Sequence, residues 1–379
     1  MPLALRPDRA SPSSTETSST TAARPVRVML VDDSLTVRTV FSRMIEKEAG
    51  LEVVADAGTA EKAIMALRTK TVDVILLDLE MPGMGGIEAI PKLLDRAKGG
   101  QILVVSSLTE NGAEHTVRAL QCGAADTMLK PRPGGFNDEY RGALLAKIRA
   151  LGEAAQKAPA EAASPKASAA PSNLTVKRQV KEARIVAIGA STGGIHALNL
   201  FLRKLPDSFR LPILITQHLP DSFMPVFAQQ MEIAARRPAV LAKEGTRIEA
   251  GHIVIAPGDG HMVVRRNGIG PGAGATVGLA HHRATSGCLP SVDPMFESLA
   301  SSYDGHVAAV VLSGMGRDGS EGAQTLARAG AAIYAQDELT SAVWGMPRGV
   351  VDAGLATNIG SPEALASALI AACSDSLAA

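Results

Sequence analysis

The sequence predicts an α/β protein with two domains, each built on a doubly wound parallel sheet with helices on both faces. Short apolar stretches alternate with segments of helical periodicity along most of the 379 residues, as is typical of such sheets. Aromatic residues make up only 3% whereas 36 residues are glycine, a composition that suits tight turns between strands and helices. Residues 151–172, rich in alanine and proline, show no apolar periodicity and divide the chain into two halves.

The first half contains five strand–helix pairs between residues 25 and 150. The predicted strands are 26–31, 52–57, 72–77, 102–105 and 126–129, and the predicted helices are 37–47, 60–69, 86–96, 113–121 and 139–151. This strict alternation indicates an open parallel sheet. Residues 1–24 are rich in Ser and Thr and lack an apolar segment, so we expect a disordered tail and not a secretion signal.

The second half alternates in the same way from 182 to 376, after a linker that we place at 151–181. The predicted strands are 184–189, 212–217, 253–257, 262–266, 306–312 and 331–335, and the predicted helices are 194–203, 223–235, 294–302, 319–329 and 362–372. The glycine-rich residues 267–280 are predicted to form a loop.

Charge and cysteine content narrow the classes of function. The 38 basic residues balance the 38 acidic residues, which gives no reason to expect nucleic acid or an anionic membrane as a partner. No apolar run reaches the roughly 18 residues of a membrane-spanning helix, so we expect no membrane insertion. Three cysteines without a CxxC pair point to a reducing compartment, the cytoplasm. Cys288 could be a nucleophile, although a small residue in a loop is the favoured interpretation.

Polar side chains follow four of the predicted strands in the first half. They are Asp32, Asp33, Asp78, Ser106 and Lys130, and the carboxyl ends of parallel strands meet at one edge of a sheet. Each aspartate taken alone could cap a helix. Three converging carboxylates instead favour a Mg²⁺ site. Asp78 would then attack a phosphoryl group, which Ser106 and Lys130 would contact.

The first half resembles the receiver domains of two-component response regulators. The resemblance rests on VDDS (31–34), LLDLEMPGMGG (76–86), VVSS (104–107) and GAADTMLKP (123–131). It implies a (βα)5 fold in which Asp78 accepts the phosphoryl group. Asp32 and Asp33 would hold Mg²⁺ together with Asp78 and the backbone of Glu80.

A second set of polar residues follows three strands of the second half. Ser191 lies in the turn GASTGG (189–194) between a predicted strand and a helix, where backbone N–H groups favour an oxyanion. The turn alone could also cap the helix or cradle a dinucleotide phosphate, although it is not a GxGxxG motif. His218 and Asp318 follow two other strands, as a general base and its orienting carboxylate would. The three residues therefore predict a serine hydrolase.

The second half resembles the catalytic domain of the chemotaxis protein-glutamate methylesterases, the CheB family. The motifs are IGASTGG (188–194), QHLP (217–220), APGDGHM (256–262), PSVDPMF (290–296), SGMGRDG (313–319) and QDELTSAVWGMP (336–347). The resemblance implies a Rossmann-like domain with Ser191 as nucleophile, His218 as base and acid, and Asp318 as orienting group. Thr192 and the backbone N–H of Met315 would support the turn and the oxyanion site.

The same resemblance implies the reaction and its partners. The substrates would be glutamate methyl esters, and also glutamines, on methyl-accepting chemotaxis receptors. A chemotaxis histidine kinase would supply the phosphoryl group, and the receiver would block the esterase until it is phosphorylated. The esterase reaction would need neither a metal nor an organic cofactor.

Four positions depart from the family patterns, and two other functions stay open. Thr127 replaces an aromatic residue and Gly85 an aspartate in the receiver, while Leu289 replaces an arginine and Pro294 is unusual in the second domain. One alternative is a non-enzymatic response regulator whose second domain only binds a partner. The other is a nucleotide-binding oxidoreductase, for which Asp207 would have to bind a ribose.

Overall fold

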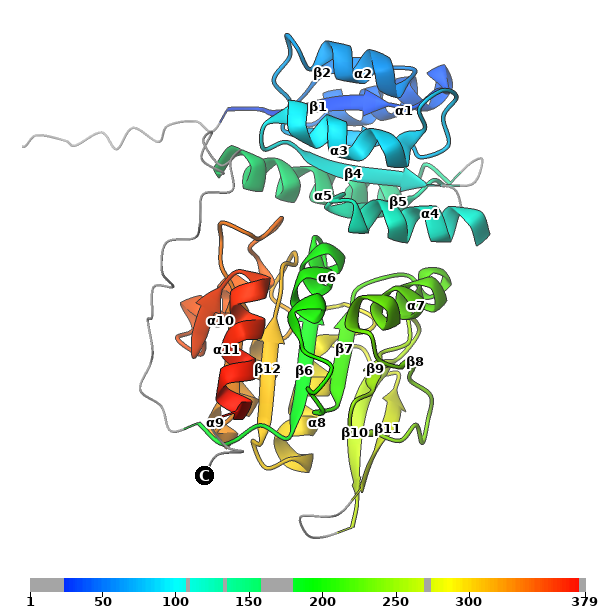
Figure 1. The fold of residues 1–379 in the computed structure, drawn as a ribbon. Coiled ribbons are helices and arrows are strands. Elements are labelled where there is room, and N and C mark those ends of the chain that lie inside the picture. Colours follow the sequence, from blue (N-terminus) through cyan, green and yellow to red (C-terminus); the bar gives the residue numbers. More distant parts are fainter. Residues whose placement is uncertain (1–23, 107–109, 132–134, 158–179, 269–273, 375–379) are drawn as a thin grey trace, which may run out of the picture.

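The computed structural model describes residues 24–106, 110–131, 135–157, 180–268 and 274–374. The tail predicted at 1–24, except Arg24, and most of the linker predicted at 151–181 lie outside the described residues. Arg24 pairs with Asp73 at 2.8 Å, so the tail prediction is wrong for this residue. Two parallel sheets with flanking helices form two domains, which lie one above the other in Figure 1. Within the described ranges, no helix has both the length and the apolarity needed to cross a membrane.

The N-terminal domain is a five-stranded parallel sheet in the order β2-β1-β3-β4-β5. Its elements are β1 (Val26–Val31), α1 (Leu35–Glu46), β2 (Leu51–Ala57), α2 (Ala60–Ala66), β3 (Val74–Leu77), α3 (Gly86–Ala97), β4 (Gln101–Ser106), α4 (Glu110–Gln121), β5 (Asp126–Leu129) and α5 (Asp138–Lys157). All of β3 is buried because helices cover both faces of the sheet. Ser34 and Thr59 accept hydrogen bonds from the first turns of α1 and α2. The helix α2 begins at Ala60 as predicted, whereas α1 begins at Leu35, two residues earlier than predicted.

The last helix of this domain is longer than predicted. The sequence predicts its end at Leu151, but α5 continues to Lys157 and therefore includes the first residues of the predicted linker. Alanine, glutamate, glutamine and lysine favour helix in this stretch even though it has no apolar stripe.

The C-terminal domain is a seven-stranded sheet in the order β14-β13-β12-β6-β7-β9-β8, in which all pairs are parallel. Its first elements are β6 (Ile185–Ala190), α6 (Gly194–Lys204), β7 (Ile213–Gln217), η1 (Asp221–Phe223), α7 (Met224–Ala235), β8 (Ala239–Leu241) and β9 (Ile253–Ile255). After the hairpin of β10 (His261–Asn267) and β11 (Gly274–Ala280) come α8 (Val292–Ser302), β12 (Val307–Val311), α9 (Ser320–Ala329), β13 (Ala332–Gln336), α10 (Met346–Asp352), β14 (Asn358–Gly360) and α11 (Pro362–Ser374). The switch point of the sheet lies between β6 and β12.

The loop predicted at 267–280 is wrong over its second part, where β11 pairs antiparallel with β10. Ala275 and Val277 alternate with more exposed residues and are buried, but the intervening glycines weaken this period-two pattern in the sequence. Three short elements were also not predicted: β8, α10 and β14. Strands of three residues carry too little periodicity to be recognised before their neighbours are known.

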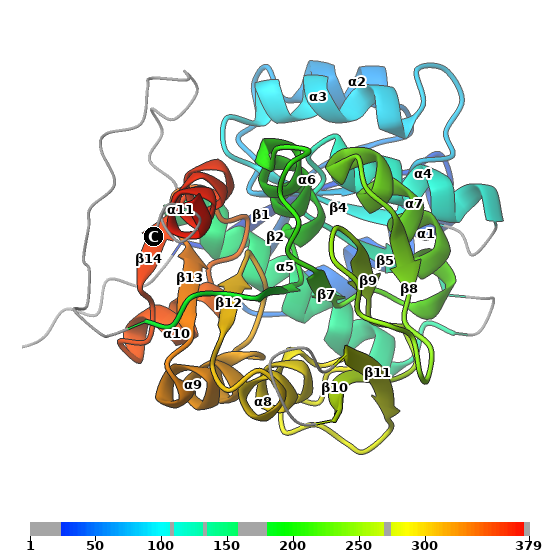
Figure 2. The same cartoon turned by 60° about the horizontal axis from the view of Figure 1, so that its bottom comes forward.

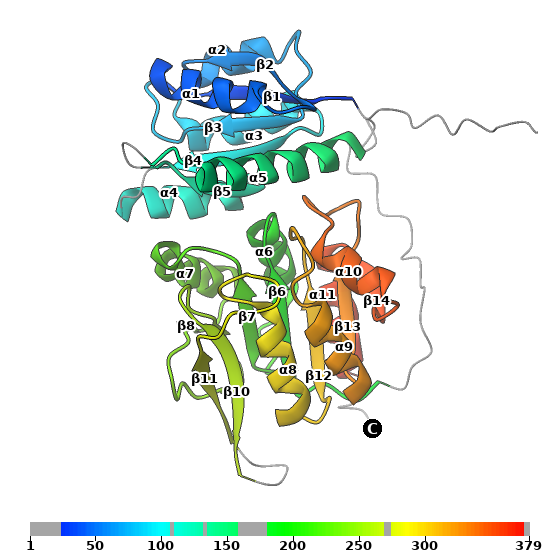
Figure 3. The ribbon, with the colours of Figure 1, turned by 180° about the vertical axis from the view of Figure 1, so that it is seen from behind.

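The N-terminal domain lies over the carboxyl edge of the second sheet. In Figures 1 and 3, which view the molecule from opposite sides, α4, β5 and α5 face α6 and α7. The side chain of Gln121 donates a hydrogen bond to Gln230 at 2.6 Å. The backbone N–H of Gly193 donates to the carbonyl of Ala125 at 2.5 Å. In the view of Figure 2 the β10–β11 hairpin lies at the edge of the second domain, away from the receiver.

Candidate active site and phosphorylation site

The turn between β6 and α6 holds Ser191 through its backbone. The N–H of Ser191 donates to the carbonyl of Ser313 at 3.0 Å, and the Ser191 carbonyl accepts from the Gln217 side chain at 3.0 Å. Each contact reaches the end of a neighbouring strand, because Ser313 follows β12 and Gln217 is the last residue of β7. The topology therefore brings the residues that follow β6, β7 and β12 to one place.

Glycine is required in this turn, at Gly193, and in the neighbouring turn after β12, at Gly314. Gly193 has a φ of 78°, and a Cβ there would lie 2.5 Å from the Ala342 Cβ and 2.6 Å from the Ser313 hydroxyl oxygen. A Cβ on Gly314 would lie 2.9 Å from the Ser191 Cβ and 2.3 Å from the sulfur of Met346. The glycines of the two motifs thus let two turns and α10 pack directly around Ser191.

His218 and Asp318 form a buried pair beside the turn. Nε2 of His218 lies 2.7 Å from Oδ2 of Asp318, and the side chains are 16% and 1% exposed. Burial alone would lower the pKa of His218, but the hydrogen bond to Asp318 and the neighbouring Cys288 outweigh it and raise this pKa to about 9. Burial would likewise raise the pKa of Asp318, but the hydrogen bond and charge of His218 hold it far below its usual value.

Two residues of the PSVD motif fix the Asp318 carboxylate. The hydroxyl of Ser291 donates to Oδ1 at 2.6 Å, and the backbone N–H of Val292 donates to Oδ2 at 2.7 Å. Because Val292 is the first residue of α8, the carboxylate lies at the positive end of a helix. The sequence assigned no function to either residue, although their motif was among those that carried the resemblance.

A second carboxyl group, Asp293, lies next to Asp318 and was not predicted as a site residue. It accepts a hydrogen bond from the backbone N–H of Gly322 at 2.8 Å. Burial raises the pKa of Asp293 to about 7, and the negative charge of Asp318 contributes to the rise. Asp293 is therefore largely protonated below neutral pH.

Ser191 and His218 are not joined by a hydrogen bond, although both belong to the described residues. Thr192 and Met315, the two residues predicted to support the turn and the oxyanion site, have different surroundings. The hydroxyl of Thr192 donates to Asp126 of the receiver at 2.5 Å, so its side chain contacts the other domain. Met315 is 37% exposed, and within the described ranges its backbone N–H has no hydrogen-bond acceptor.

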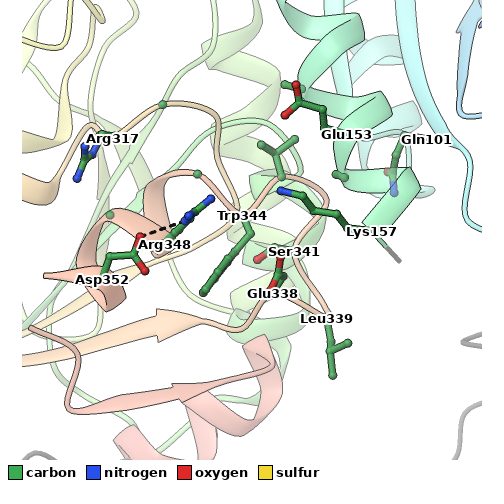
Figure 4. A pocket seen from close by; sticks show the side chains of 16 residues that line it. Gln101, Glu153, Lys157, Arg317, Glu338, Leu339, Ser341, Trp344, Arg348 and Asp352 are labelled. Carbon is green, nitrogen blue, oxygen red and sulfur yellow. Dashed lines mark hydrogen bonds and ion pairs between the residues drawn. The ribbon is translucent and has the colours of Figure 1, made fainter. Parts of the chain in front are cut away.

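The Asp318 turn borders two cavities. One, of about 550 Å³, is lined by Cys288, Met315 and Asp318 among others. The other, of about 750 Å³, lies between α5 and α10 together with the loop that precedes it. In Figure 4, Glu153 and Lys157 approach this second cavity from α5, opposite Trp344 and the Arg348–Asp352 ion pair. The cavity leaves the contact between the two domains incompletely packed.

The polar residues predicted at the receiver edge converge. Lys130 Nζ lies 2.9 Å from Asp32 and 2.7 Å from Asp78, both of which are buried. Asp32, Asp33 and Asp78 each offer an oxygen, and these oxygens lie within 4.8 Å of one another. The backbone N–H of Glu80 donates to Asp78 at 3.3 Å. Oxygen donors in this arrangement suit a hard divalent cation such as Mg²⁺.

Burial and charge set the protonation of this second site. Burial raises the pKa of Asp78, although Lys130 opposes the rise. Burial alone would lower the pKa of Lys130, but hydrogen bonds to Asp78 and Asp32 outweigh it and raise this pKa. Ser106 lies at the end of β4, and its hydroxyl accepts a hydrogen bond from Thr116 of α4 at 2.8 Å. The sheet edge that carries Asp78 is thus linked to α4, the helix that faces the second domain.

Comparison with known proteins gives the same assignment for both halves. Residues 186–369 match the family model of the CheB methylesterases, and residues 28–135 match that of the response regulator receiver domains. Protein-glutamate methylesterase/protein-glutamine glutaminase 2 of Caulobacter vibrioides is 45% identical over 334 residues, which cover 87% of this chain and 94% of the relative. The chain belongs to the CheB methylesterase family.

Two further proteins are similar to this CheB family member. Protein-glutamate methylesterase/protein-glutamine glutaminase 1 of Rhodospirillum rubrum is 39% identical over 366 residues and covers 89% of this chain and 93% of its own length. The crystal structure of the Thermotoga maritima CheB methylesterase catalytic domain is 31% identical, with a TM-score of 0.47. It covers 50% of this chain and 98% of its own.

The four departures from the family patterns can now be located in this CheB family member. Thr127 is buried, and within the described ranges its hydroxyl has no hydrogen-bond partner. Gly85 precedes α3 with a φ of 70°, which suits glycine. Leu289 is 52% exposed, and Pro294 lies in the first turn of α8, where proline is tolerated.

The acid that an oxidoreductase would need is not at the carboxyl edge. Asp207 lies in the connection before β7, and its carboxylate pairs with Arg236 at 2.9 Å. The carboxyl end of β7 instead carries His218.

Proposed function

We propose that this chain hydrolyses glutamate methyl esters, and deamidates glutamines, on methyl-accepting chemotaxis receptors. The 2.7 Å contact between His218 and Asp318, beside the Ser191 turn, carries the proposal. The names of the two relatives support it. We assign the catalytic domain to 182–376, the receiver to 25–150 and the linker to 151–181, with α5 extending into the linker as far as Lys157.

The proposed reaction uses a covalent acyl-enzyme. Ser191 attacks the γ-carbonyl carbon while His218 accepts the hydroxyl proton. The oxyanion lies near the start of α6 and the backbone N–H of Met315, with Thr192 supporting the turn. The intermediate then expels methanol, or ammonia from a glutamine, with a proton from His218. Water activated by His218 releases the glutamate, and no metal or organic cofactor takes part in our proposal.

We infer from the raised pKa of His218 that the described arrangement is a resting state. With a pKa of about 9, the imidazole is a cation at neutral pH and has no free electron pair for the Ser191 proton. A catalytic state needs a neutral His218 that contacts Ser191. We infer that separation of the two domains, or binding of the receptor, provides it.

The receiver restrains the esterase by contact with the nucleophile turn. Asp126 accepts from Thr192, and the carbonyl of Ala125 accepts from Gly193, so two residues of β5 and its preceding loop rest on this turn. The interface combines these hydrogen bonds with apolar packing of Ala342 and Val343 against the receiver, and it borders a cavity. Relative motion is the usual behaviour of two domains joined by such a contact. A receptor helix could reach Ser191 only after this contact opens.

Phosphorylation would act on this contact through α4. We propose that Asp78 takes a phosphoryl group from a chemotaxis histidine kinase. Mg²⁺ would be held by Asp32, Asp33, Asp78 and the backbone of Glu80, and it would neutralise charge on the phosphoryl oxygens. Lys130 pairs with the phosphoryl group and Ser106 donates to it.

The helix α4 connects the Asp78 site to the C-terminal domain, because it is hydrogen-bonded to Ser106 through Thr116 and to Gln230 through Gln121. Reorientation of the Ser106 hydroxyl breaks its bond with Thr116, and α4 then shifts against Gln230 of α7. Because the kinase draws on ATP, we place the protein in the cytoplasm. We assign it neither a nucleic acid partner nor insertion into the membrane.

Methanol release from methylated receptor tests the proposal, with and without a small-molecule phosphoryl donor. Ser191→Ala should abolish release in both conditions, whereas Ser367→Ala, an exposed serine of α11, should match the wild type. Asp78→Asn should keep the basal rate and lose the increase with donor. If Ser191→Ala retained the wild-type rate, the nucleophile would be wrong and a partner-binding function without catalysis would be favoured.

A further inference from the structure

Beside His218 and Asp318 lies Cys288, a third side chain that can bind a metal ion and that the hydrolytic mechanism does not use. A ring nitrogen of His218, the sulfur of Cys288 and a carboxylate oxygen of Asp318 lie within 4.8 Å of one another. Cys288 lies in the segment between β11 and α8 and is half-buried. Imidazole, thiolate and carboxylate are the usual protein ligands of Zn²⁺. Within the described ranges, the receiver aspartates form the other group of this kind.

We propose that His218, Cys288 and Asp318 bind Zn²⁺ and that the bound ion inhibits the esterase. The binding stands on the geometry alone, whereas the inhibition rests on the proposed function of His218. In a tetrahedral zinc site the ligand atoms lie about 3.3–3.6 Å apart, from Zn–N and Zn–O bonds of about 2.0 Å and a Zn–S bond of about 2.3 Å. His218 and Asp318 would separate slightly from 2.7 Å, and the Cys288 segment would move inward.

The surroundings of the three residues suit a bound cation. Ser291 and Val292 hold the Asp318 carboxylate with two hydrogen bonds, which is the kind of outer support that ligating carboxylates have in metal sites. An ionised carboxylate offers four lone-pair directions, so these two bonds leave room for a metal. Access comes through the 550 Å³ cavity, whose lining includes the carboxyl groups of Asp293, Asp318 and Glu321 against one guanidinium, Arg317.

Binding removes the group that the hydrolysis needs. Zn²⁺ displaces the thiol proton and the imidazolium proton, and the nitrogen electron pair then binds the metal. His218 can no longer take the proton of Ser191, so ester hydrolysis stops while the ion is bound. Three protein ligands leave a fourth position for water. The soft thiolate excludes Mg²⁺, which prefers oxygen, so the receiver cation does not occupy the site at Cys288.

Binding is measured first, on the full chain and independently of activity. Zn²⁺ affinity is obtained by competition with a chromophoric chelator, and Co²⁺ is added as a spectroscopic probe. We expect a thiolate-to-cobalt absorption band for the wild type and its loss in Cys288→Ser and Cys288→Ala. Zinc affinity should fall at least about tenfold in both variants, because even loss of an outer-shell partner costs this much. Cys122→Ser and Cys373→Ser, at the two other cysteines, should bind as the wild type does.

Inhibition is measured as the ratio of methanol release with and without Zn²⁺ for each variant. Wild type, Cys122→Ser and Cys373→Ser should be inhibited, a chelator should restore them, and Mg²⁺ should have no such effect. The Cys288 variants should need at least about tenfold more Zn²⁺ for the same inhibition. Equal zinc affinity in wild type and both Cys288 variants, or a cobalt complex without a thiolate band, would overturn the site. Zinc binding at Cys288 without loss of methanol release would overturn the inhibition and also contradict His218 as the base.

Discussion

The carboxylate of Asp126 in the receiver accepts a hydrogen bond from the hydroxyl of Thr192, the residue that follows Ser191. The same carboxylate pairs with Lys147 of α5 at 2.5 Å. A single receiver side chain thus joins its own last helix to the turn of the other domain. We propose that the receiver restrains the esterase through this contact, without entering its site.

Replacing Asp126 by alanine should weaken this restraint. A hydrogen bond to a charged group contributes about 1.5 kcal/mol, so the ratio of separated to docked protein should rise about tenfold. Methanol release without a phosphoryl donor should increase by up to that factor, and the further increase with donor should shrink. Asp95→Ala, at an exposed aspartate of α3, is the matched control and should change neither rate. An unchanged basal rate in Asp126→Ala would show that this contact does not restrain the esterase.

The rate of hydrolysis should rise with pH because His218 must lose its proton to act as a base. With a pKa of about 9, the neutral fraction grows as pH rises from 6.5 through 9, and kcat/KM of the unphosphorylated protein should follow it. Asp318→Asn removes the charge that stabilises the cation, so the profile should shift to lower pH while kcat falls roughly 10³–10⁴-fold. A profile that is the same in both proteins would contradict the assignment of His218 and Asp318.

Asp293 should make the protein less stable as the pH rises. Its pKa is about 7 in the folded state against 3.8 in the unfolded state, so the folded state binds more protons between these values. The free energy of unfolding therefore falls across that window. Asp293→Asn keeps an oxygen for the Gly322 N–H but lacks the titration. The free energy of unfolding of this variant should therefore increase by about 2–4 kcal/mol relative to wild type as the pH rises from 4 to 7.

Urea unfolding of the wild type and Asp293→Asn at several pH values checks this sign. Glu114→Gln, at an exposed carboxyl group of α4, is the control and should keep a constant difference from wild type. A difference between wild type and Asp293→Asn that stays constant with pH would mean that Asp293 titrates normally.

Alanine should be tolerated far less at Gly193 than at Gly354. Both have positive φ, 78° and 65°, which costs a non-glycine residue about 1–2 kcal/mol. Only at Gly193 would the new methyl group also meet the Ala342 Cβ and the Ser313 hydroxyl. We expect Gly354→Ala to lose about 1 kcal/mol and keep its activity, and Gly193→Ala to lose about 2–5 kcal/mol together with most of the methanol release.

Thermal unfolding and esterase assays of these two variants separate backbone strain from the clash. Equal losses of stability and activity would show that φ alone explains the glycine at 193. A larger loss of activity at Gly193, after correction for the folded fraction, would support its position in the Ser191 turn.

Much of the fold and of the candidate site could be predicted because the polar residues that follow parallel strands can be recognised in the sequence. Parallel strands place their following residues at one edge, so Asp32, Asp78 and Lys130 were expected together, and Lys130 lies within 3 Å of both aspartates. The same rule brought His218 to Asp318. The prediction of a loop at 267–280 was wrong because the glycines of β11 mask its alternation of buried and exposed residues. The predicted last helix of the N-terminal domain was too short because charged helix formers extend α5 beyond its apolar stripe.

The sequence by itself determined the two α/β domains, the phosphorylation residues and the Ser, His and Asp candidates, because these depend on local periodicity and on the order of strand ends. Only the tertiary structure decided which side chains surround them. Asp126 reaches Thr192, Ser291 holds Asp318, and Cys288 lies beside His218 through segments that are distant in the chain. Burial then shifts the pKa of Asp293 and His218. Such contacts and shifts arise from packing between domains and loops, for which periodicity carries no signal.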